Sequence, residues 1–444
     1  MVHEERFSNN AKRRKVESMS KVCTVAIIGC GGRGSGYGKR MNANPEKYNV
    51  VSICDPRTDR LDRYGKQFGV AEDMLFTDDK EFFKERRADI LVIGTQDRQH
   101  VDMACKALEL GYHILLEKPI SPIKDELYQL LDTHKKHPQN VVVCHVLRYA
   151  PGFVKIKEIL ESGEIGQLRV IEWTEQVAYW HQSHSFVRGN WRRDDETSPM
   201  IMQKCCHDLD LLQYYVGSRC ESVYSTGELS FFKAENQPEG ASDRCADCKF
   251  IKTCPYSAEH HYIDRWYQRG AKAEDWPFDV VCSDFPLTEE KIRKAYQSNQ
   301  YGQCVFKCDN NVVDNQTISI KFENGVKVNM LMTGFTADPS RKATFYGTMG
   351  EIRFNDIEDY IDVVKFGKAP VRYKISDLVE NAHAGYGHGG GDAVMVDSLY
   401  EMIVNPNAKI QTSLEASVES HLMALCAEES RKSGKVVKIH QENN

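Results

Sequence analysis

The sequence predicts an α/β protein that opens with a parallel, helix-covered sheet, and three observations support this fold class. An apolar run at residues 22–28 suits a buried strand, and a glycine-rich turn follows it at once. Further apolar runs at 50–54, 88–93 and 113–116 alternate with helical stretches. Strands that alternate with helices form βαβ units with right-handed crossovers. We therefore expect a parallel sheet in the N-terminal part.

The bulk composition excludes several classes of protein. A chain of 444 residues is long enough for two domains. With 58 basic and 64 acidic residues, the net charge of −6 gives no electrostatic reason to expect nucleic acid. No run of ~18 apolar residues is present, so we expect no membrane span. The N-terminus has no apolar signal segment. We therefore expect a cytoplasmic protein.

The glycine-rich turn matches the dinucleotide-binding pattern G-x-G-x-x-G. One glycine makes the tight turn, one admits a pyrophosphate, and one lets helix and strand pack closely. The helix that follows presents free N–H groups to the phosphates. Asp55 ends the second strand, where a carboxylate would bind the adenosine ribose and repel a 2′-phosphate. This predicts NAD, with NADP as an alternative because Arg57 and Arg60 lie nearby. The predicted cofactor-binding residues here are Gly29, Gly31, Gly32, Arg33, Gly34 and Asp55.

Polar residues also follow the next two strands of the predicted sheet. In such sheets the ligand lies at the carboxyl ends of the strands. The segment after residue 93 and the tripeptide after residue 116 are therefore expected beside the nicotinamide. The predicted residues are Thr95, Gln96, Asp97, His100, Glu117 and Lys118.

These motifs, above all Glu117-Lys118-Pro119 at a strand end, resemble the Gfo/Idh/MocA family of NAD(P)-dependent sugar and cyclitol oxidoreductases. The likeness covers residues 21 to about 220 well and the rest more loosely. The resemblance implies a second, α/β domain with a large, open, mainly antiparallel sheet. That sheet is expected to cover the nicotinamide and to join subunits into a dimer or tetramer.

The domain limits follow from these signals. Residues 1–20 are polar and aperiodic, and we expect a disordered tail, although the basic run at 12–15 also fits a nuclear address. Residues 21–147 are expected to form the Rossmann domain, and residues 148–444 the substrate-binding domain with a cysteine-rich insert at about 240–310. Asn324-Gly325 between alternating runs predicts a hairpin in the second sheet.

The resemblance also implies a catalytic set. Lys118 corresponds to the family lysine that contacts the reacting hydroxyl, often before a cis proline, and its ammonium would stabilise a developing alkoxide. In the predicted helix 199–212, His207 aligns with the family's general base, although a histidine at a packing seam is the alternative. Gln203 stands where a carboxylate is usual. The adjacent Lys204 is therefore a third candidate catalytic residue.

Aromatic, histidine and arginine residues suit a carbohydrate pocket, because sugar rings stack on aromatic faces and charged groups grip hydroxyls. The stretch at 179–192 is dense in such residues, and three glycines after His388 permit close approach of a ligand. A folded loop on the sheet is the alternative for the first stretch. The predicted substrate-binding residues are Tyr149, Trp191, Arg192, Lys204 and His388.

The insert carries a C-x2-C-x5-C pattern in a charged stretch. Thiolates at this spacing can share one metal ion. A structural zinc is the simpler prediction, an iron–sulfur cluster is the rival, and unligated thiols are the third alternative. The predicted ligands are Cys245, Cys248, Cys254 and Cys308, with Cys304, His260 or His261 as other choices for the fourth.

The main functional hypothesis is an NAD(P)-dependent oxidoreductase that acts on a secondary hydroxyl of a sugar, sugar derivative or cyclitol. The second is a glycosidase that uses the same hydride step transiently and leaves its NAD unchanged; the departure at Gln203 and the extra Lys204 favour it. The third is a non-catalytic, cofactor-binding regulator. Retention of both Lys118 and His207 argues against the third.

Overall fold

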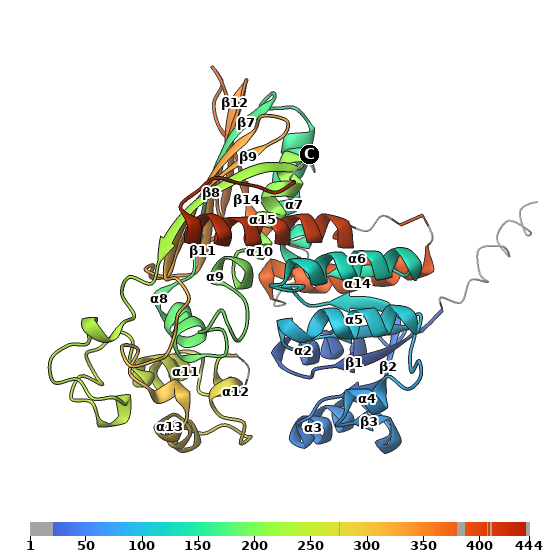
Figure 1. Cartoon of the computed structure of the whole chain (residues 1–444), viewed down its shortest axis with the longest axis vertical. Coiled ribbons are helices and arrows are strands. Elements are labelled where there is room, and N and C mark those ends of the chain that lie inside the picture. Colours follow the sequence, from blue (N-terminus) through green and yellow to red (C-terminus); the bar gives the residue numbers. More distant parts are fainter. Residues whose placement is uncertain (1–20, 275, 380–386, 406, 409–410, 441–444) are drawn as a thin grey trace, which may run out of the picture.

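The computed structural model describes residues 21–274, 276–379, 387–405, 407–408 and 411–440. The predicted tail, residues 1–20, lies outside them. Two sheets organise the chain, one at the lower right and one at the top of Figure 1. Among the described residues, no helix combines the length and apolar composition that crossing a membrane requires.

The N-terminal sheet has six strands in the order β3-β2-β1-β4-β5-β6, and every pair is parallel. Strands β1, β4 and β6 are almost wholly buried because helices cover both faces, as the continuous apolar runs predicted. The elements are β1 (Cys23–Ile28), α2 (Gly32–Asn42), β2 (Tyr48–Cys54), α3 (Thr58–Phe68), β3 (Leu75–Phe76), α4 (Asp79–Phe82), β4 (Ile90–Ile93), α5 (His100–Glu109), β5 (His113–Leu116), α6 (Lys124–Lys136) and β6 (Val141–Val143).

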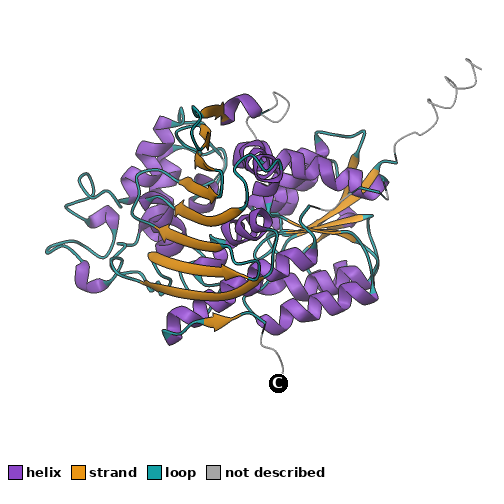
Figure 2. Ribbon diagram, turned by 90° about the horizontal axis from the view of Figure 1, so that it is seen from above, coloured by secondary structure: helices purple, strands orange, loops and turns teal. Residues whose placement is uncertain are grey.

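The second sheet has nine strands in the order β14-β13-β12-β11-β7-β10-β9-β8-β15. Only β7 and β10 pair in parallel, so the prediction of a mainly antiparallel sheet is confirmed. Figure 2 shows its strands stacked beside the helices. The strands are β7 (Leu168–Gln176), β8 (Cys220–Glu228), β9 (Asn315–Phe322), β10 (Lys327–Thr333), β11 (Ser340–Gly347), β12 (Gly350–Asn355), β13 (Tyr360–Lys365), β14 (Val371–Lys374) and β15 (Val437–Lys438).

One face of this sheet is covered and the other is open. In β9 and β10 buried and exposed residues alternate, as expected when helices pack on one face only. The predicted hairpin joins these two strands, and Gly325 turns it with a φ of +85°. The helices of this half are α7 (Pro151–Glu161), α8 (Tyr179–His181), α9 (Met200–Gln203), α10 (Cys206–Val216), α14 (Gly391–Val404) and α15 (Leu414–Ser433).

Helix α14 returns to the N-terminal half of the molecule. Its residues Met395, Val396 and Leu399 pack in one core with strands β1, β2 and β4, on the face of the sheet that α2 also covers. The parallel sheet therefore receives one of its covering helices from the far end of the chain. The domain limits at residues 147 and 148 stay a prediction. Helix α14 belongs to the later part of the chain but packs on the earlier sheet.

The cysteine-rich insert has a core of its own. Its helices are α11 (Arg265–Gln268), α12 (Phe278–Val281) and α13 (Glu289–Ser298). Aromatic and aliphatic side chains such as Tyr262, Trp266 and Tyr296 fill this core, and Cys245 and Cys282 lie within it. In Figure 1 the insert lies at the lower left, facing helix α3 of the parallel domain.

Candidate active site at the carboxyl edge of the parallel sheet

The glycine-rich turn is built as the pattern predicts. Gly29 has a φ of +85°, and a Cβ there would lie 2.7 Å from the backbone of Gly94. A Cβ on Gly34 would lie 2.0 Å from the carbonyl oxygen of Gly29. By contrast, a Cβ on Gly32 would have no neighbour within 4 Å, and one on Gly31 only a side-chain nitrogen of Arg60. The outer glycines therefore pack the turn, while the middle pair leaves room for phosphates at the start of α2.

Two alanine substitutions should separate these roles. Gly34→Ala forces a methyl group into backbone, so we expect it to destabilise the fold by about 3 kcal/mol or more. Gly32→Ala should leave the melting temperature nearly unchanged but weaken NAD binding about tenfold, because its methyl group occupies the space that the pyrophosphate needs. Thermal melting and calorimetric titration with NAD measure the two effects. Equal melting temperatures for both variants would contradict the assignment.

Asp55 lies below this turn and is 2% exposed. Its carboxylate accepts hydrogen bonds from the backbone N–H of Cys30 (2.7 Å) and of Arg57 (3.0 Å). The guanidinium of Arg60 also reaches it at 3.3 Å. The carboxylate is thus fixed at the carboxyl end of β2, where it was predicted.

The guanidinium of Arg33 is paired with two carboxylates. Its Nε donates to Glu117 (2.8 Å), and its two terminal nitrogens donate to Asp392 at 3.2 and 2.7 Å. Glu117 also accepts from the hydroxyl of Tyr37 at 2.6 Å. Burial opposes ionisation of Glu117, but the charges of Arg33 and Lys118 and the Tyr37 hydrogen bond outweigh it and lower its pKa. Arg33 and Glu117 therefore join the glycine-rich turn to helix α14.

The predicted residues after β4 divide into accessible and buried groups. Gln96 is exposed and Thr95 is half-buried, so both can face a ligand. His100 is buried, and its ring nitrogens lie 2.8 Å from the carbonyl oxygen of Pro119 and 3.1 Å from that of Thr95. This histidine braces the loops after β4 and β5, because both of its nitrogens are already engaged with backbone.

Lys118 follows β5, and the Lys118-Pro119 bond is cis. Its ammonium donates a 3.0 Å hydrogen bond to the carbonyl oxygen of Gln203. The single helix predicted over 199–212 is wrong at this point, because the chain forms two helices, α9 and α10, with a break at Lys204 and Cys205. The carbonyl that ends α9 is instead bound by Lys118. The break brings the lysine and the start of α10 together.

His207 lies in the first turn of α10 and is 6% exposed. Its Nδ1 is buried without a hydrogen-bond partner. The rings of His145 and His388 lie with their centroids 5.8 and 5.9 Å from its ring. Burial first, and then the positive charge of Lys118, hold the pKa of His207 well below its usual 6.5. A neutral imidazole with an available nitrogen is the form that accepts a proton.

His145 is a member of this cluster that the sequence argument missed. It follows β6 and is wholly buried, and neither of its ring nitrogens has a hydrogen-bond partner. Burial and the charges of Arg148 and Lys118 lower its pKa well below 6.5. Its position after a buried apolar strand, next to those of Lys118 and Asp97, was the signal that could have identified it.

Asp210 holds α10 in place. Its carboxylate makes a two-pronged ion pair with Arg148, at 2.6 and 2.7 Å, and both side chains are buried. Burial raises the pKa of Asp210, although the adjacent guanidinium opposes that effect. This ion pair ties α10 to the short turn Val146–Tyr149 that follows β6.

Arg148→Met should leave the Asp210 carboxylate buried and unpaired. We expect a loss of about 3–5 kcal/mol in unfolding free energy at pH 7. The loss should shrink at acid pH, because an unpaired buried carboxyl has a folded-state pKa above its unfolded one and is neutral below both. Urea unfolding at pH 5 and pH 7 measures this. In the exposed pair of Lys135 and Asp132, the control Lys135→Met should cost less than about 1 kcal/mol; equal losses would refute the argument.

Lys204 lies at the break between α9 and α10, and its ammonium is 3.4 Å from Glu175. Glu175 also faces Arg341 at 2.9 Å, and that guanidinium binds Asp208 at 2.8 Å. Burial raises the pKa of Glu175 to about 7, against the charges of Arg341 and Lys204. Lys204 is thus held toward the second sheet, at the site's margin.

The side chain of Gln203 binds a carboxylate of the parallel domain. Its amide donates a 2.9 Å hydrogen bond to Asp97, which also accepts from the hydroxyl of Ser198. Asp97 is buried and lies after β4. The parallel domain therefore contributes a carboxylate next to the position where Gln203 lacks one.

Aromatic rings form the outer side of the site. Trp180, His181 and Trp276 lie with ring centroids 5.0–5.6 Å apart. Burial first, and then the charges of Lys204 and Lys118, lower the pKa of His181 well below 6.5, which places it near both lysines. The insert supplies Trp276, which no sequence signal pointed to.

Of the predicted substrate-binding residues, His388 lies next to His207, whereas Tyr149 lies in a hydrophobic core. His388 faces His207, as described, and its Nδ1 lies 3.1 Å from Asp392. Tyr149 is 2% exposed in the core of the parallel domain, where its hydroxyl lies 3.2 Å from that of Thr412. The short helical turn after β6 directs its ring inward, so its geometry does not support substrate binding.

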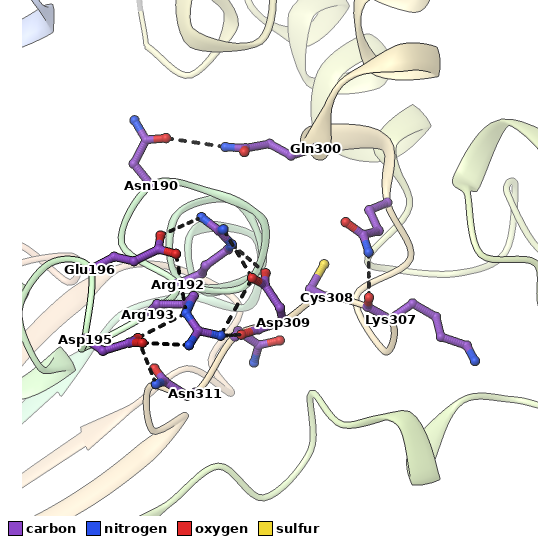
Figure 3. A network of polar contacts seen from close by, with 12 residues as sticks. Asn190, Arg192, Arg193, Asp195, Glu196, Gln300, Lys307, Cys308, Asp309 and Asn311 are labelled. Atoms are coloured by element: carbon purple, nitrogen blue, oxygen red, sulfur yellow. Dashed lines mark hydrogen bonds and ion pairs between the residues drawn. The ribbon is translucent and has the colours of Figure 1, made fainter.

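Trp191 and Arg192 lie on a loop beside the insert. Trp191 packs against the main core next to Phe186. Arg192 binds Asp309 at 2.6 Å within the polar network shown in Figure 3. The carboxylate of Asp309 already neutralises the guanidinium of Arg192, and this ion pair links the loop to the insert.

The insert's cysteines surround Arg188, a buried side chain. Its guanidinium donates to the Cys245 sulfur at 3.5 Å and to the carbonyl oxygen of Tyr256 at 2.8 Å. Burial raises the pKa of Cys254, and that of Cys308 to about 12, although the charge of Arg188 opposes both shifts. Within the described residues, no three His, Cys, Asp or Glu side chains are arranged to hold a metal ion. The predicted set Cys245, Cys248, Cys254 and Cys308 therefore has no structural support as a metal site.

The fold and site define a two-domain α/β protein with a dinucleotide-binding Rossmann domain. Residues 23–145 match the model of the oxidoreductase family with an NAD-binding Rossmann fold, and residues 157–439 match its C-terminal α/β domain. The chain belongs to this Gfo/Idh/MocA family of oxidoreductases.

Two curated relatives illustrate the range of similarity. YteT of Bacillus subtilis (strain 168) is 23% identical over 362 residues, which are 80% of this chain and 82% of that protein. Inositol 2-dehydrogenase of Salmonella typhimurium (strain LT2) is 24% identical over 204 residues, which are 45% of this chain and 56% of the enzyme. The match to the inositol dehydrogenase thus spans only about half of each protein.

Solved structures share the fold over nearly the whole chain. Levoglucosan dehydrogenase, in complex with NADH and levoglucosan, has a TM-score of 0.69 at 17% identity and covers 95% of this chain and 100% of its own. The WlbA dehydrogenase of Chromobacterium violaceum, in complex with NADH and UDP-GlcNAcA, has a TM-score of 0.65 at 15% identity and covers 96% and 98%.

Proposed function

We propose that this oxidoreductase removes hydride from a secondary hydroxyl of a sugar, sugar derivative or cyclitol. The observation that carries the proposal is that Lys118, bound to the carbonyl that ends α9, lies close enough to His207 at the start of α10 for its charge to help keep that imidazole neutral. The names of the relatives and neighbours, which include inositol 2-dehydrogenase and levoglucosan dehydrogenase, support the same substrate class.

The cofactor that fits the nucleotide site is NAD. Room at Gly31 and Gly32 and the start of α2 suit a pyrophosphate, and the fixed carboxylate of Asp55 suits a ribose diol. Arg60 is paired with Asp55, and Arg57 is paired with Asp59 at 2.5 Å, so both cations are already partly neutralised. NADP remains the alternative. When bound, the nicotinamide supplies a hydride acceptor.

In the proposed reaction, two residues of this chain act on the substrate hydroxyl: one takes its proton and the other binds its oxygen. His207, held neutral by burial and by the charge of Lys118, accepts the hydroxyl proton. The Lys118 ammonium donates to the same oxygen and stabilises the negative charge that develops on it. Glu117, fixed by Arg33, orients the backbone N–H of Lys118 through a 3.0 Å hydrogen bond.

Less now supports the two alternative functions, the glycosidase and the non-catalytic regulator. The glycosidase hypothesis rested on the missing carboxylate at Gln203 and on Lys204, and these residues bind Asp97 and Glu175 respectively. The unpartnered catalytic nitrogen argues against a regulator without chemistry. Assembly into a dimer or tetramer through the open face of the nine-stranded sheet remains part of the proposal, since β9 and β10 expose alternate side chains there.

The test is oxidation of a panel of sugars and cyclitols, followed at 340 nm with NAD and with NADP. We expect reduction of NAD by at least one compound and a much weaker signal with NADP. Protein that binds NAD but oxidises no compound of the panel, and instead releases an aglycone from a chromogenic glycoside, would replace the proposal with the glycosidase alternative.

A further inference from the structure

A cavity of about 770 Å³ lies between the parallel domain and the insert. The glycine-rich turn and α3 form one wall, with Gly31, Gly32, Arg60 and Arg63 among its residues. Glu274, Asp279 and residues 283–286 of the insert form the opposite wall. This cavity is distinct from the cluster around Lys118 and His207, none of whose residues line it.

The position of the cavity indicates which half of a dinucleotide it suits. Gly31 and Gly32, the two glycines with room for phosphates, line it, and Asp55, which follows β2, binds the lining residues Cys30 and Arg60. A pyrophosphate at the glycines has the nicotinamide on the Lys118 side. The adenosine must then extend the other way, toward α3 and the insert.

The two walls meet through side chains rather than through backbone pairing. The Arg63 guanidinium lies 3.9 Å from the centre of the Phe285 ring. The same guanidinium is 3.8 Å from the carboxylate of Glu274, which in turn accepts a 3.2 Å hydrogen bond from the backbone N–H of Leu287. Arg63 and Phe285 are each only partly buried. The guanidinium and the ring already stack on each other, so a purine would stack on the outer face of this pair rather than between its two members.

We propose that the insert residues Glu274, Asp279 and 283–286 complete the adenosine pocket, and that the stacked pair of Phe285 and Arg63 offers its outer face to the adenine. The inference rests on the proposed use of a dinucleotide but goes beyond it, because it assigns part of the cofactor site to the insert. The Rossmann domain then holds the pyrophosphate and ribose, and a segment more than 200 residues downstream closes over the base.

The test uses the intact chain and three ligands in calorimetric titration: NAD, ADP-ribose, which keeps the adenosine, and nicotinamide mononucleotide, which lacks it. Phe285→Ala should raise the Kd of both NAD and ADP-ribose about tenfold, as loss of one stacking surface does for a base. The Kd of nicotinamide mononucleotide should stay within about twofold, and Phe285→Tyr should restore the wild-type values.

Phe366→Ala is the matched control, because that phenylalanine is 62% exposed just after β13 of the distant sheet. Arg63→Met tests the opposite wall and should weaken the same two ligands. Should Phe285→Ala lower the melting temperature markedly, Arg63→Met decides alone. An ADP-ribose Kd that neither variant changes would overturn the inference, while NAD binding without oxidation of any substrate would overturn only the proposed function.

Discussion

Lys118→Met is expected to lower kcat for substrate oxidation about 10²–10³-fold, because the ammonium that stabilises the developing alkoxide is lost. Methionine keeps the length of the apolar stem and removes only the charge and its hydrogen bonds. The Kd of NAD should change little, since Asp55 and the glycine-rich turn hold the far half of the dinucleotide. Steady-state kinetics at 340 nm and calorimetric titration measure the two quantities.

Lys135→Met is a suitable control for this change. Lys135 lies on the exposed side of α6, where it pairs with Asp132. Its replacement should leave kcat within about twofold, as expected for a surface substitution. A Lys118→Met enzyme with wild-type kcat would show that Lys118 only supports the break between α9 and α10.

His207→Asn is expected to lower kcat about 10²–10⁴-fold, the range for loss of a general base. His134→Gln on α6 is the control, because that ring binds the backbone carbonyl of Gln139 rather than the site. A loss of folding would appear in the melting temperature, so the comparison requires equal melting curves. An unchanged kcat would assign His207 to packing instead.

The pH dependence follows from the same histidine. Burial, and then the charge of Lys118, keep the pKa of His207 well below 6.5, so the imidazole is neutral and competent at pH 6.5 and above. The kcat/KM for oxidation should therefore show no acid limb between pH 8 and 6.5. Lys118→Met removes a cation that lowers the pKa of His207, so its residual activity should fall at a higher pH than that of the wild type. An acid limb that does not move would contradict the pairing.

Much of the fold could be predicted because its signals are local. Continuous apolar runs mark strands covered on both faces, and a glycine-rich turn between strand and helix marks the nucleotide site. These signals located the tight turn, where a Cβ on Gly29 would lie 2.7 Å from the backbone of Gly94 and one on Gly34 would lie 2.0 Å from the carbonyl oxygen of Gly29. The hairpin at Asn324-Gly325 was equally local.

The catalytic cluster was predictable only in part. Lys118 and His207 were found through a resemblance, and the structure places them together. The break between α9 and α10 was not predictable, because the carbonyl of Gln203 is bound by Lys118, 85 residues away in sequence. Helical periodicity depends only on residues within one segment, so it cannot predict a helix break that a distant hydrogen-bond donor stabilises.

The sequence by itself determined the class of the protein, the glycine-rich turn, the position of Asp55 after β2 and the lysine after β5. Only the tertiary structure decided that Arg33 pairs with Asp392 of α14, and that the insert forms one wall of the cavity beside the glycine-rich turn. The physical reason is the range of the interactions. Turn geometry and strand burial depend on adjacent residues, whereas ion pairs and shared cavities depend on which distant segments the packed cores bring together.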